Sequence, residues 1–346
     1  NLSGTEFQLP SDRLETLSGF MLSGQKYFIR GSFINYMAYG RLSAREGNGR
    51  ATGIITALKN LLTVSEMPRL SELRDMLNYT ADPGDPDTAL IDTKYFPNAY
   101  VLVHSDADYY MAARGGASHV MGTESINNEN ILYRNLSYGG STCFMYDGTE
   151  YLGIYGLWDY AMIPGTTAFW ESDAELAAWG GSFSPLTAHS GGLSDGECGA
   201  VYQQLLNEEG LTGYTAFIFY GGLMLGLGAD ITCINELNRK QINTTLDQCY
   251  LKENATIAGE PVVSGATVED DMGVFNGAFA YYNLGGGDLT VFAGEVAGNY
   301  ERVDPPYDSD NYSGAVFKPY INYGTSPDGV NFVYAVVTNA DGNAPL

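Results

Sequence analysis

The sequence predicts a mainly β protein with an α-helical N-terminal part. Gly occurs 43 times and Tyr 26 times in 346 residues, and these residues favour strands joined by tight turns over long helices. Apolar residues recur at three- and four-residue steps early in the chain, whereas later short apolar runs alternate with Gly, Asn and Asp. We therefore assign residues 1–85 to a helical domain and residues 86–346 to a large antiparallel β-sandwich domain.

Three helices are expected before this boundary. The helical spacing of apolar residues runs through residues 11–28 and again from Ala51 to Leu62. A third, shorter helix follows from Pro68 to Leu77, with Pro near the first turn, where its missing N–H costs nothing. The next segment, residues 81–87 (ADPGDPD), cannot continue a helix, so the domain boundary is placed there.

Short strands are expected throughout the second domain. The most hydrophobic stretch, Thr215–Leu227, is broken by glycines and is too short for a membrane-spanning helix, which needs about 20 apolar residues. We therefore expect no transmembrane segment. The predicted strands are Ala99–Val103, Tyr109–Ala113, Thr142–Tyr146, Ala216–Tyr220, Ala278–Tyr282, Thr290–Ala293 and Phe332–Val337.

The charge of the chain limits its partners. The formal net charge is −24, from 41 acidic and 17 basic residues. Nucleic acid is not expected as a partner, because phosphate binding needs clustered Lys and Arg. An acidic polysaccharide could be bound only where the few arginines gather in a cleft.

No cofactor is expected. Walker A, GxSxG and HExxH motifs are absent, and the three histidines lack metal-ligand spacing. This pattern argues against nucleotide-binding proteins, serine hydrolases and metallohydrolases. Calcium is the one ion with candidate ligands, three carboxylates around one predicted strand pair: Asp147, Glu150 and Asp159.

Cysteines and glycosylation sequons favour a secreted, extracellular protein. Four cysteines allow three pairings, of which we favour Cys233–Cys249 with Cys143–Cys198. The chain begins within helix-like sequence and without a signal peptide, as expected of a processed N-terminus or a fragment. Six N-x-S/T sequons begin at Asn1, Asn78, Asn135, Asn243, Asn254 and Asn311.

Three sites could carry chemistry. Arg41 and Arg45, four residues apart, could clamp a carboxylate through bidentate hydrogen bonds; a solvated helix end or an internal ion pair would give the same spacing. The phrase from Glu124 to Asn130 is by itself a polar turn before a strand. Trp158, in an aromatic-rich stretch before Ile163-Pro-Gly-Thr-Thr167, could stack on a sugar ring or fill the core.

The order of several phrases resembles one family. These phrases are IRGSFINYMAYGRLSAR, TESINNEN, WDYAMIPGTTA, GGLSDGECGA and QINTTLDQC. Together they are similar to the polysaccharide lyases of the hyaluronate, chondroitin AC and xanthan lyase type (family 8), from about Ile29 to Asn339. The resemblance implies the end of an (α/α) toroid followed by a supersandwich.

The resemblance also implies site residues. Arg41 would lie beside a catalytic tyrosine, Arg45 would be a second cleft arginine, and Glu124 would orient the arginine and the tyrosine. Asn127 and Trp158 would contact the sugar. The family reaction is β-elimination at a uronic acid, in which Asn and Arg side chains neutralise the C5 carboxylate while Tyr and His move the proton.

Part of that apparatus has no counterpart here. The family's Asn, His and Tyr precede the segment that matches Ile29–Arg45, and the 28 residues before Ile29 contain no His. The main expectation is therefore a lyase whose remaining active site lies on a preceding or partner chain. The alternatives are a non-catalytic glycan-binding or structural protein of an extracellular surface or viral envelope, and a glycoside hydrolase with paired carboxylates.

Overall fold

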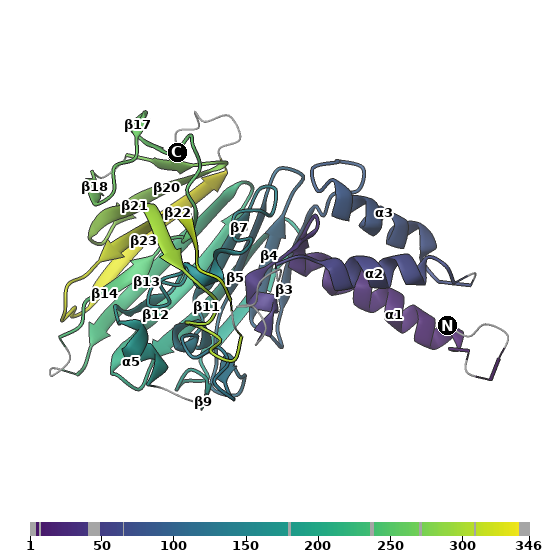
Figure 1. Cartoon of the computed structure of the whole chain (residues 1–346), viewed down its shortest axis with the longest axis horizontal. Helices are drawn as coiled ribbons and strands as arrows, with labels where there is room; N and C mark the ends of the chain where they lie inside the picture. The colour runs from purple at the N-terminus through teal and green to yellow at the C-terminus, as the bar shows by residue number, and fades with distance from the viewer. Residues whose placement is uncertain are drawn as a thin grey trace.

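Two regions of different secondary structure form the chain, a helical arm and a larger block of β-sheets (Figure 1). The computed structural model describes residues 5–6, 8–40, 49–64, 66–178, 181–235, 239–269, 272–307 and 309–338. The arm consists of α1 (Ser11–Ser23), α2 (Thr52–Leu61) and α3 (Leu70–Ala81). The three predicted helices are thereby confirmed.

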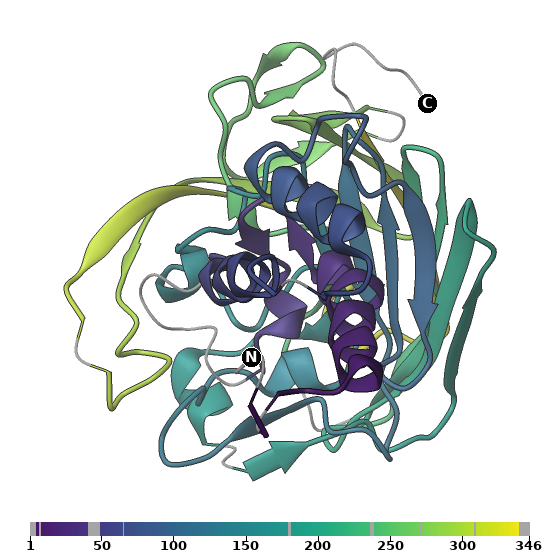
Figure 2. The same cartoon turned by 90° about the vertical axis from the view of Figure 1, so that its right-hand side faces the viewer.

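The helices of the arm pack on one another through narrow apolar faces. In α1, Leu14, Met21 and Leu22 are buried on one side, as their spacing predicts. The Ser18 hydroxyl donates to the Pro68 carbonyl at 2.9 Å and so ties α1 to the start of α3. Figure 2 shows the three helices grouped together in front of the sheets.

A short hairpin joins the arm to the sheets. It is formed by β1 (Ile29–Arg30) and β2 (Phe33–Ile34), between the 3₁₀ turns η1 (Gln25–Phe28) and η2 (Tyr36–Ala38). Arg30 is 1% exposed, and its guanidinium donates to carbonyls of the sheet block, including those of Asp106 and Tyr146 at 2.8 Å each. The arm is therefore fixed to the sheets by a buried cation that several carbonyls hold.

The sheets are antiparallel throughout the described part of the chain. A four-stranded sheet, in spatial order, contains β3 (Asp92–Phe96), β4 (Val101–Ser105), β5 (Tyr110–Arg114) and β7 (Ser141–Met145). A six-stranded sheet contains β18 (Ala266–Val268), β21 (Asp288–Gly298), β22 (Tyr312–Asn322), β14 (Ile242–Thr245) and β8 (Thr167–Phe169), with β15 (Cys249–Tyr250) pairing to β22.

The largest sheet has nine strands. In spatial order they are β10 (Ser190–Ser194), β11 (Cys198–Leu206), β12 (Leu211–Tyr220), β13 (Leu223–Cys233), β23 (Val330–Thr338), β20 (Phe279–Gly285), β19 (Val274–Asn276), β16 (Thr256–Ile257) and β17 (Glu260–Pro261). Its inner face shares one apolar core with the other two sheets. Gly228 lies opposite Phe332 with no room for a Cβ, so glycine permits the ring to cross the sheet.

Every predicted strand is confirmed to within a few residues, and so is the β-sandwich. Several strands were not predicted, among them the long strands β11 and β22. In β11 the buried polar Gln203 interrupts the apolar alternation. In the part of the chain that the structure describes, no helix is long and apolar enough to cross a membrane.

The predicted disulfides are wrong. All four cysteines are free thiols: Cys143 and Cys249 are buried, whereas the other two are half-buried. The Sγ atom of Cys198 donates to Asp195 at 3.3 Å, and that of Cys233 to the Asn235 carbonyl at 3.5 Å. An even number of cysteines does not show which of them lie close together in the fold. Here the thiols of Cys198 and Cys233 donate hydrogen bonds to nearby oxygen atoms instead.

Two of the sequons cannot carry a glycan in the folded chain. Asn135 and Asn243 are 3% and 2% exposed, so a sugar would have no room. Asn78, Asn254 and Asn311 are exposed. Asn1 lies outside the described residues.

Candidate functional site

The phrase Glu124–Asn130 forms a tight hairpin at the edge of the sheet block. Glu124 lies in β6 (Thr123–Ser125), which pairs with β9 (Gly181–Phe183). The chain then turns through Asn127 and Asn128, whose φ angles are 56° and 61°, and the Glu129 N–H donates to the Ile126 carbonyl at 3.0 Å. Two successive left-handed residues define a type I′ turn, and asparagine tolerates this conformation better than most residues.

This hairpin brings two predicted site residues onto one small element. Glu124 is half-buried, and Asn127 is exposed at the tip of the turn. The base of the hairpin is fixed, because the Ile131 N–H donates to the Val303 carbonyl at 2.9 Å. A half-buried carboxylate beside an exposed amide is suited to orient a cation and contact a sugar. Both roles stay predictions.

Arg41 and Arg45 lie outside the described residues, but both flanks of their segment are firmly held. Before it, the Asn35 side chain caps the Met37 N–H at 2.9 Å and donates to the Tyr110 hydroxyl at 2.9 Å. After it, the Ala51 N–H donates to the Ser32 carbonyl at 2.7 Å. The described residues on both sides are therefore fixed beside the junction of arm and sheets.

Trp158 is a core residue, which corrects its prediction as a sugar-stacking residue. The residue is 0% exposed, and its ring makes edge contacts with Tyr36, Tyr155 and Tyr160 at centroid distances of 4.9–5.9 Å. Its Nε1–H donates to the Gln248 carbonyl at 3.0 Å. No ring face is left for a sugar. Because Tyr36 belongs to η2, Trp158 instead supports the flank of the arginine segment.

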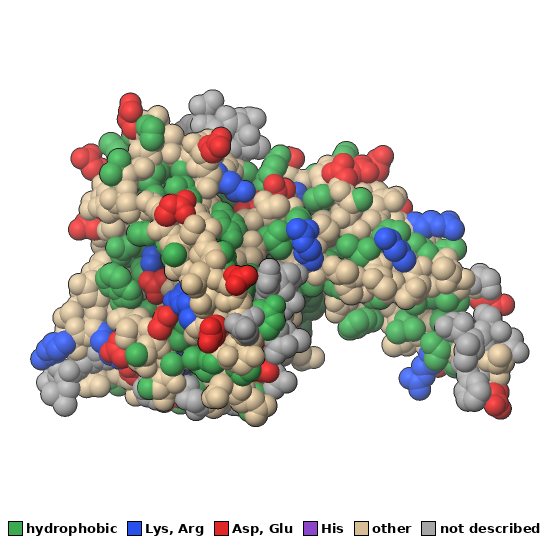
Figure 3. Space-filling model, viewed as in Figure 1, with side chains coloured by type: hydrophobic (Ala, Val, Ile, Leu, Met, Phe, Trp, Pro, Cys, Tyr) green, Lys and Arg blue, Asp and Glu red, His purple; other side chains and the backbone are tan. Residues whose placement is uncertain are grey.

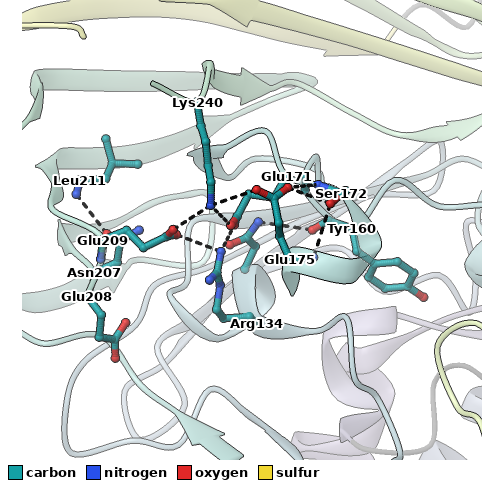
Figure 4. Close-up of polar contacts among 12 residues, drawn as sticks. Arg134, Tyr160, Glu171, Ser172, Glu175, Asn207, Glu208, Glu209, Leu211 and Lys240 are labelled. Atoms are coloured by element: carbon teal, nitrogen blue, oxygen red, sulfur yellow. Dashed lines mark hydrogen bonds and ion pairs between the residues drawn. The ribbon is translucent and has the colours of Figure 1, made fainter. Parts of the chain in front are cut away.

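A network of charged side chains includes Arg134 of the helix α4 (Arg134–Ser137), which packs against β6 of the hairpin (Figure 4). Arg134 and Lys240 reach the same two carboxylates from opposite sides. Arg134 is paired with Glu171 and, at 3.0 Å, with Glu209; Lys240 lies 2.5 Å from Glu171 and 3.1 Å from Glu209. The side chains of Glu171 and Arg134 are 0% and 2% exposed, so these charges depend on their mutual pairing.

The network joins segments that are distant in the sequence. Arg134 begins α4 (Arg134–Ser137), which packs against β6. Glu171 precedes α5 (Asp173–Ala177), whose N-terminus is closed by a capping box of Ser172 and Glu175. Sequence reasoning missed the network; the S-x-x-E pattern of Ser172 and Glu175 was the one local signal near it.

The predicted calcium ligands do not form a site. Glu150 accepts from the N–H groups of Tyr146 and Gly148 at 2.9 and 3.0 Å, whereas Asp147 accepts from Thr149 and Asp159 pairs with Lys318 at 2.8 Å. Each carboxylate is thus used separately. Across the ranges that the structure describes, no group of three His, Cys, Asp or Glu side chains could hold a metal ion.

The ionisation of the tyrosines bears on any proton transfer. Wherever a tyrosine pKa is shifted in the described ranges, it is raised, and burial is the main cause. Tyr36, next to the arginine segment, is an example. A tyrosine with a raised pKa stays protonated near neutral pH, so its phenolate is rarely present to take up a proton.

Figure 3 shows acidic and basic side chains scattered over the face of the molecule that is seen in Figure 1, without one basic patch.

Comparison with known proteins gives the same family as the sequence phrases. The model for polysaccharide lyase family 8, super-sandwich domain, matches residues 91–344. Chondroitinase-AC of Pedobacter heparinus is 27% identical over 345 residues, which cover 96% of this chain and 47% of that protein.

Solved structures show the same fold. The structure of a chondroitinase AC lyase has a TM-score of 0.83 at 24% identity, and the match covers 99% of this chain and 51% of the lyase chain. A xanthan lyase of Paenibacillus has a TM-score of 0.79 at 16% identity, covering 98% and 36%. A chondroitin AC lyase of Streptomyces coelicolor A3 has a TM-score of 0.76 at 18% identity, covering 98% and 50%. The chain thus spans about half the length of the chondroitinases that it matches, and it belongs to polysaccharide lyase family 8.

Proposed function

We propose that this chain forms part of a polysaccharide lyase that cleaves a uronic-acid-containing glycan, of the chondroitin or hyaluronan kind, by β-elimination. The observation that carries the proposal is the extent of the similarity. The family model covers residues 91–344, and the identity to chondroitinase-AC covers 96% of the chain and so includes most of the helical arm as well.

The reaction assigns a role to each retained residue. Arg41 and Arg45 would hold the C5 carboxylate of the uronate, which makes the C5 proton more acidic. A base removes that proton, the C4–O bond breaks, and a C4–C5 double bond forms while the leaving oxygen gains a proton. Glu124 would orient Arg41 by charge pairing, and Asn127 would contact the sugar.

A second polypeptide segment is proposed to supply the base. Shifted tyrosine pKa values in the described ranges are raised, so those tyrosines stay protonated near neutral pH and do not readily supply a phenolate base. The chain also covers 47% of chondroitinase-AC. We therefore propose that helices on a preceding or partner chain complete the site, docking on the arm, where Leu9 and Phe20 are 39% and 58% exposed.

The first test is the composition of the natively purified protein. Intact mass and N-terminal sequencing under non-denaturing conditions should reveal an associated chain, or a longer one, that carries helical sequence with Asn, His and Tyr. Digestion of chondroitin by that assembly should then generate an unsaturated uronate, which absorbs in the near ultraviolet.

Two variants of this assembly test the residue roles. Arg41→Ala should abolish the absorbance change while leaving the circular dichroism spectrum unchanged, and Glu124→Gln should lower the rate, since an oriented charge is lost. Arg69→Ala is the matched control, because Arg69 is a half-buried arginine of the helical arm, paired with Glu72 and outside the proposed site. Full turnover by the Arg41→Ala variant would remove the site assignment.

One observation favours a second candidate function. A net charge of −24 repels a polyanionic substrate, whose approach is normally steered by positive clefts. A non-catalytic glycan-binding or structural component would retain glycan without the absorbance change. A hydrolase would instead generate reducing ends without that change.

The proposed substrate also fits an extracellular location. Glycans of this kind are large acidic polymers, and their cleavage requires an enzyme on the same side of the membrane. A secretory route remains a proposal here, since the free thiols remove the predicted disulfides as an argument for it.

A further inference from the structure

A groove of about 510 Å³ lies against strands β21 and β22 of the six-stranded sheet, and none of the proposed catalytic residues lines it. Its floor comes from β21 and β22, where Phe292 is paired with Lys318 across the two strands. Its walls come from the segments around Asp159 and Trp170, and from Arg302. Pockets of 300–1,000 Å³ are typical of small-ligand sites.

The groove combines aromatic surface with opposed charges. Trp170 is 47% exposed, and Phe292 lies in the floor. Lys318 pairs with Asp159 at 2.8 Å, and its Nζ lies 5.4 Å from the centre of the Phe292 ring. The opposed charges place fixed donors and acceptors next to an aromatic surface.

Arg302 is held especially firmly. Its guanidinium bonds both carboxylate oxygens of Asp173 at 2.7–3.0 Å and donates to the carbonyls of Gly156 and Trp158 at 3.0 Å each. The two cations are therefore each neutralised by a carboxylate in the same groove. Free anions would gain little here, whereas hydroxyl groups could donate to a carboxylate and accept from its partner cation.

We propose that this groove binds an uncharged pyranose unit of a glycan, with one sugar face on Trp170 and the hydroxyls on the Lys318–Asp159 and Arg302–Asp173 pairs. Arg302 also links the groove to the hairpin through the chain, because the next residue, Val303, accepts from the Ile131 N–H at the base of the Asn127 hairpin. Binding here is independent of the proposed activity, since a sugar can be held whether or not it is cut.

Titration with N,N′-diacetylchitobiose, an uncharged disaccharide, tests the proposal by calorimetry and tryptophan fluorescence. The wild-type chain should bind it, and Trp170→Ala should weaken binding at least about fivefold, since aromatic contacts contribute about 1 kcal/mol beyond area burial. Tyr220→Ala is the matched control, because Tyr220 is 69% exposed on a different sheet, in β12. This control should bind like the wild type.

Two further measurements keep the proposal falsifiable. Asp159→Asn should also weaken binding while the urea midpoint of unfolding stays close to that of Trp170→Ala. Inorganic sulfate should not compete with the sugar. Equal affinity in the wild type, Trp170→Ala and Tyr220→Ala, absence of binding by the wild type, or competition by sulfate would each overturn the assignment.

Discussion

Removing one partner from the buried Arg134–Glu171 pair should destabilise the fold strongly. Arg134→Met removes the buried partner of the Glu171 carboxylate, whose side chain is 0% exposed. Glu171 then keeps its contact with Lys240 at 2.5 Å. Glu171→Gln leaves Arg134, 2% exposed, paired with Glu209 at 3.0 Å. Breaking a buried pair costs about 3–5 kcal/mol of stability. Because each remaining charge keeps one partner, we expect each single substitution to cost about 3 kcal/mol.

The double variant distinguishes pairing from simple packing loss. In Arg134→Met/Glu171→Gln no buried charge of the pair is left, and the Lys240–Glu209 contact at 3.1 Å is retained. We expect a loss of about 3 kcal/mol rather than the about 6 kcal/mol that independent effects would sum to. The coupling free energy would then be about 3 kcal/mol.

Equilibrium unfolding in urea, followed by circular dichroism, measures these free energies. The control is Arg69→Met, which breaks the Arg69–Glu72 pair at side-chain exposures of 33% and 51% and should cost less than about 1 kcal/mol. The reasoning is refuted if Arg134→Met costs no more than Arg69→Met, or if the two single losses simply add.

Two further predictions concern the core. Trp158→Ala should lower the free energy of unfolding by about 3–5 kcal/mol, because the side chain is fully buried. Trp158→Phe should cost less stability and leave glycan affinity unchanged. A loss of affinity without a loss of stability would restore the sugar-stacking role. His104 is buried against Thr93, with its Nδ1 2.6 Å from the hydroxyl, and burial lowers its pKa. The unfolded chain therefore binds more protons below about pH 6.5, so this residue makes the free energy of unfolding fall as pH falls from about 7 to about 5. The fall should be smaller in His104→Gln, and an unchanged pH dependence in that variant would contradict the assignment.

The parts of the fold that follow from local patterns were predictable. Apolar spacing predicted α1, α2 and α3, and short apolar runs predicted seven of the strands: β4, β5, β7, β12, β20, β21 and β23. Where a polar residue faces inward the pattern failed, as at Gln203 in β11. The hairpin was readable as a polar turn, and the structure adds the left-handed pair Asn127 and Asn128 that fixes its shape.

The candidate site was less predictable, for a physical reason. Arg134, Glu171, Glu209 and Lys240 are separated by dozens of residues and meet only through tertiary packing, so no spacing rule reveals them. Trp158 shows the reverse problem. Its aromatic neighbours in the sequence suit both a sugar platform and a core, and only its burial decides between them.

The position of β23 in the nine-stranded sheet has a consequence for synthesis. This strand, Val330–Thr338, pairs with β13 on one side and β20 on the other, and so it joins residues about a hundred positions earlier to the rest of the sheet. Until the ribosome has released it, the sheet is two separate halves, each with an unpaired edge. Folding of this domain must therefore be completed after translation of residue 338, and nascent chains that stall earlier expose edges that promote aggregation.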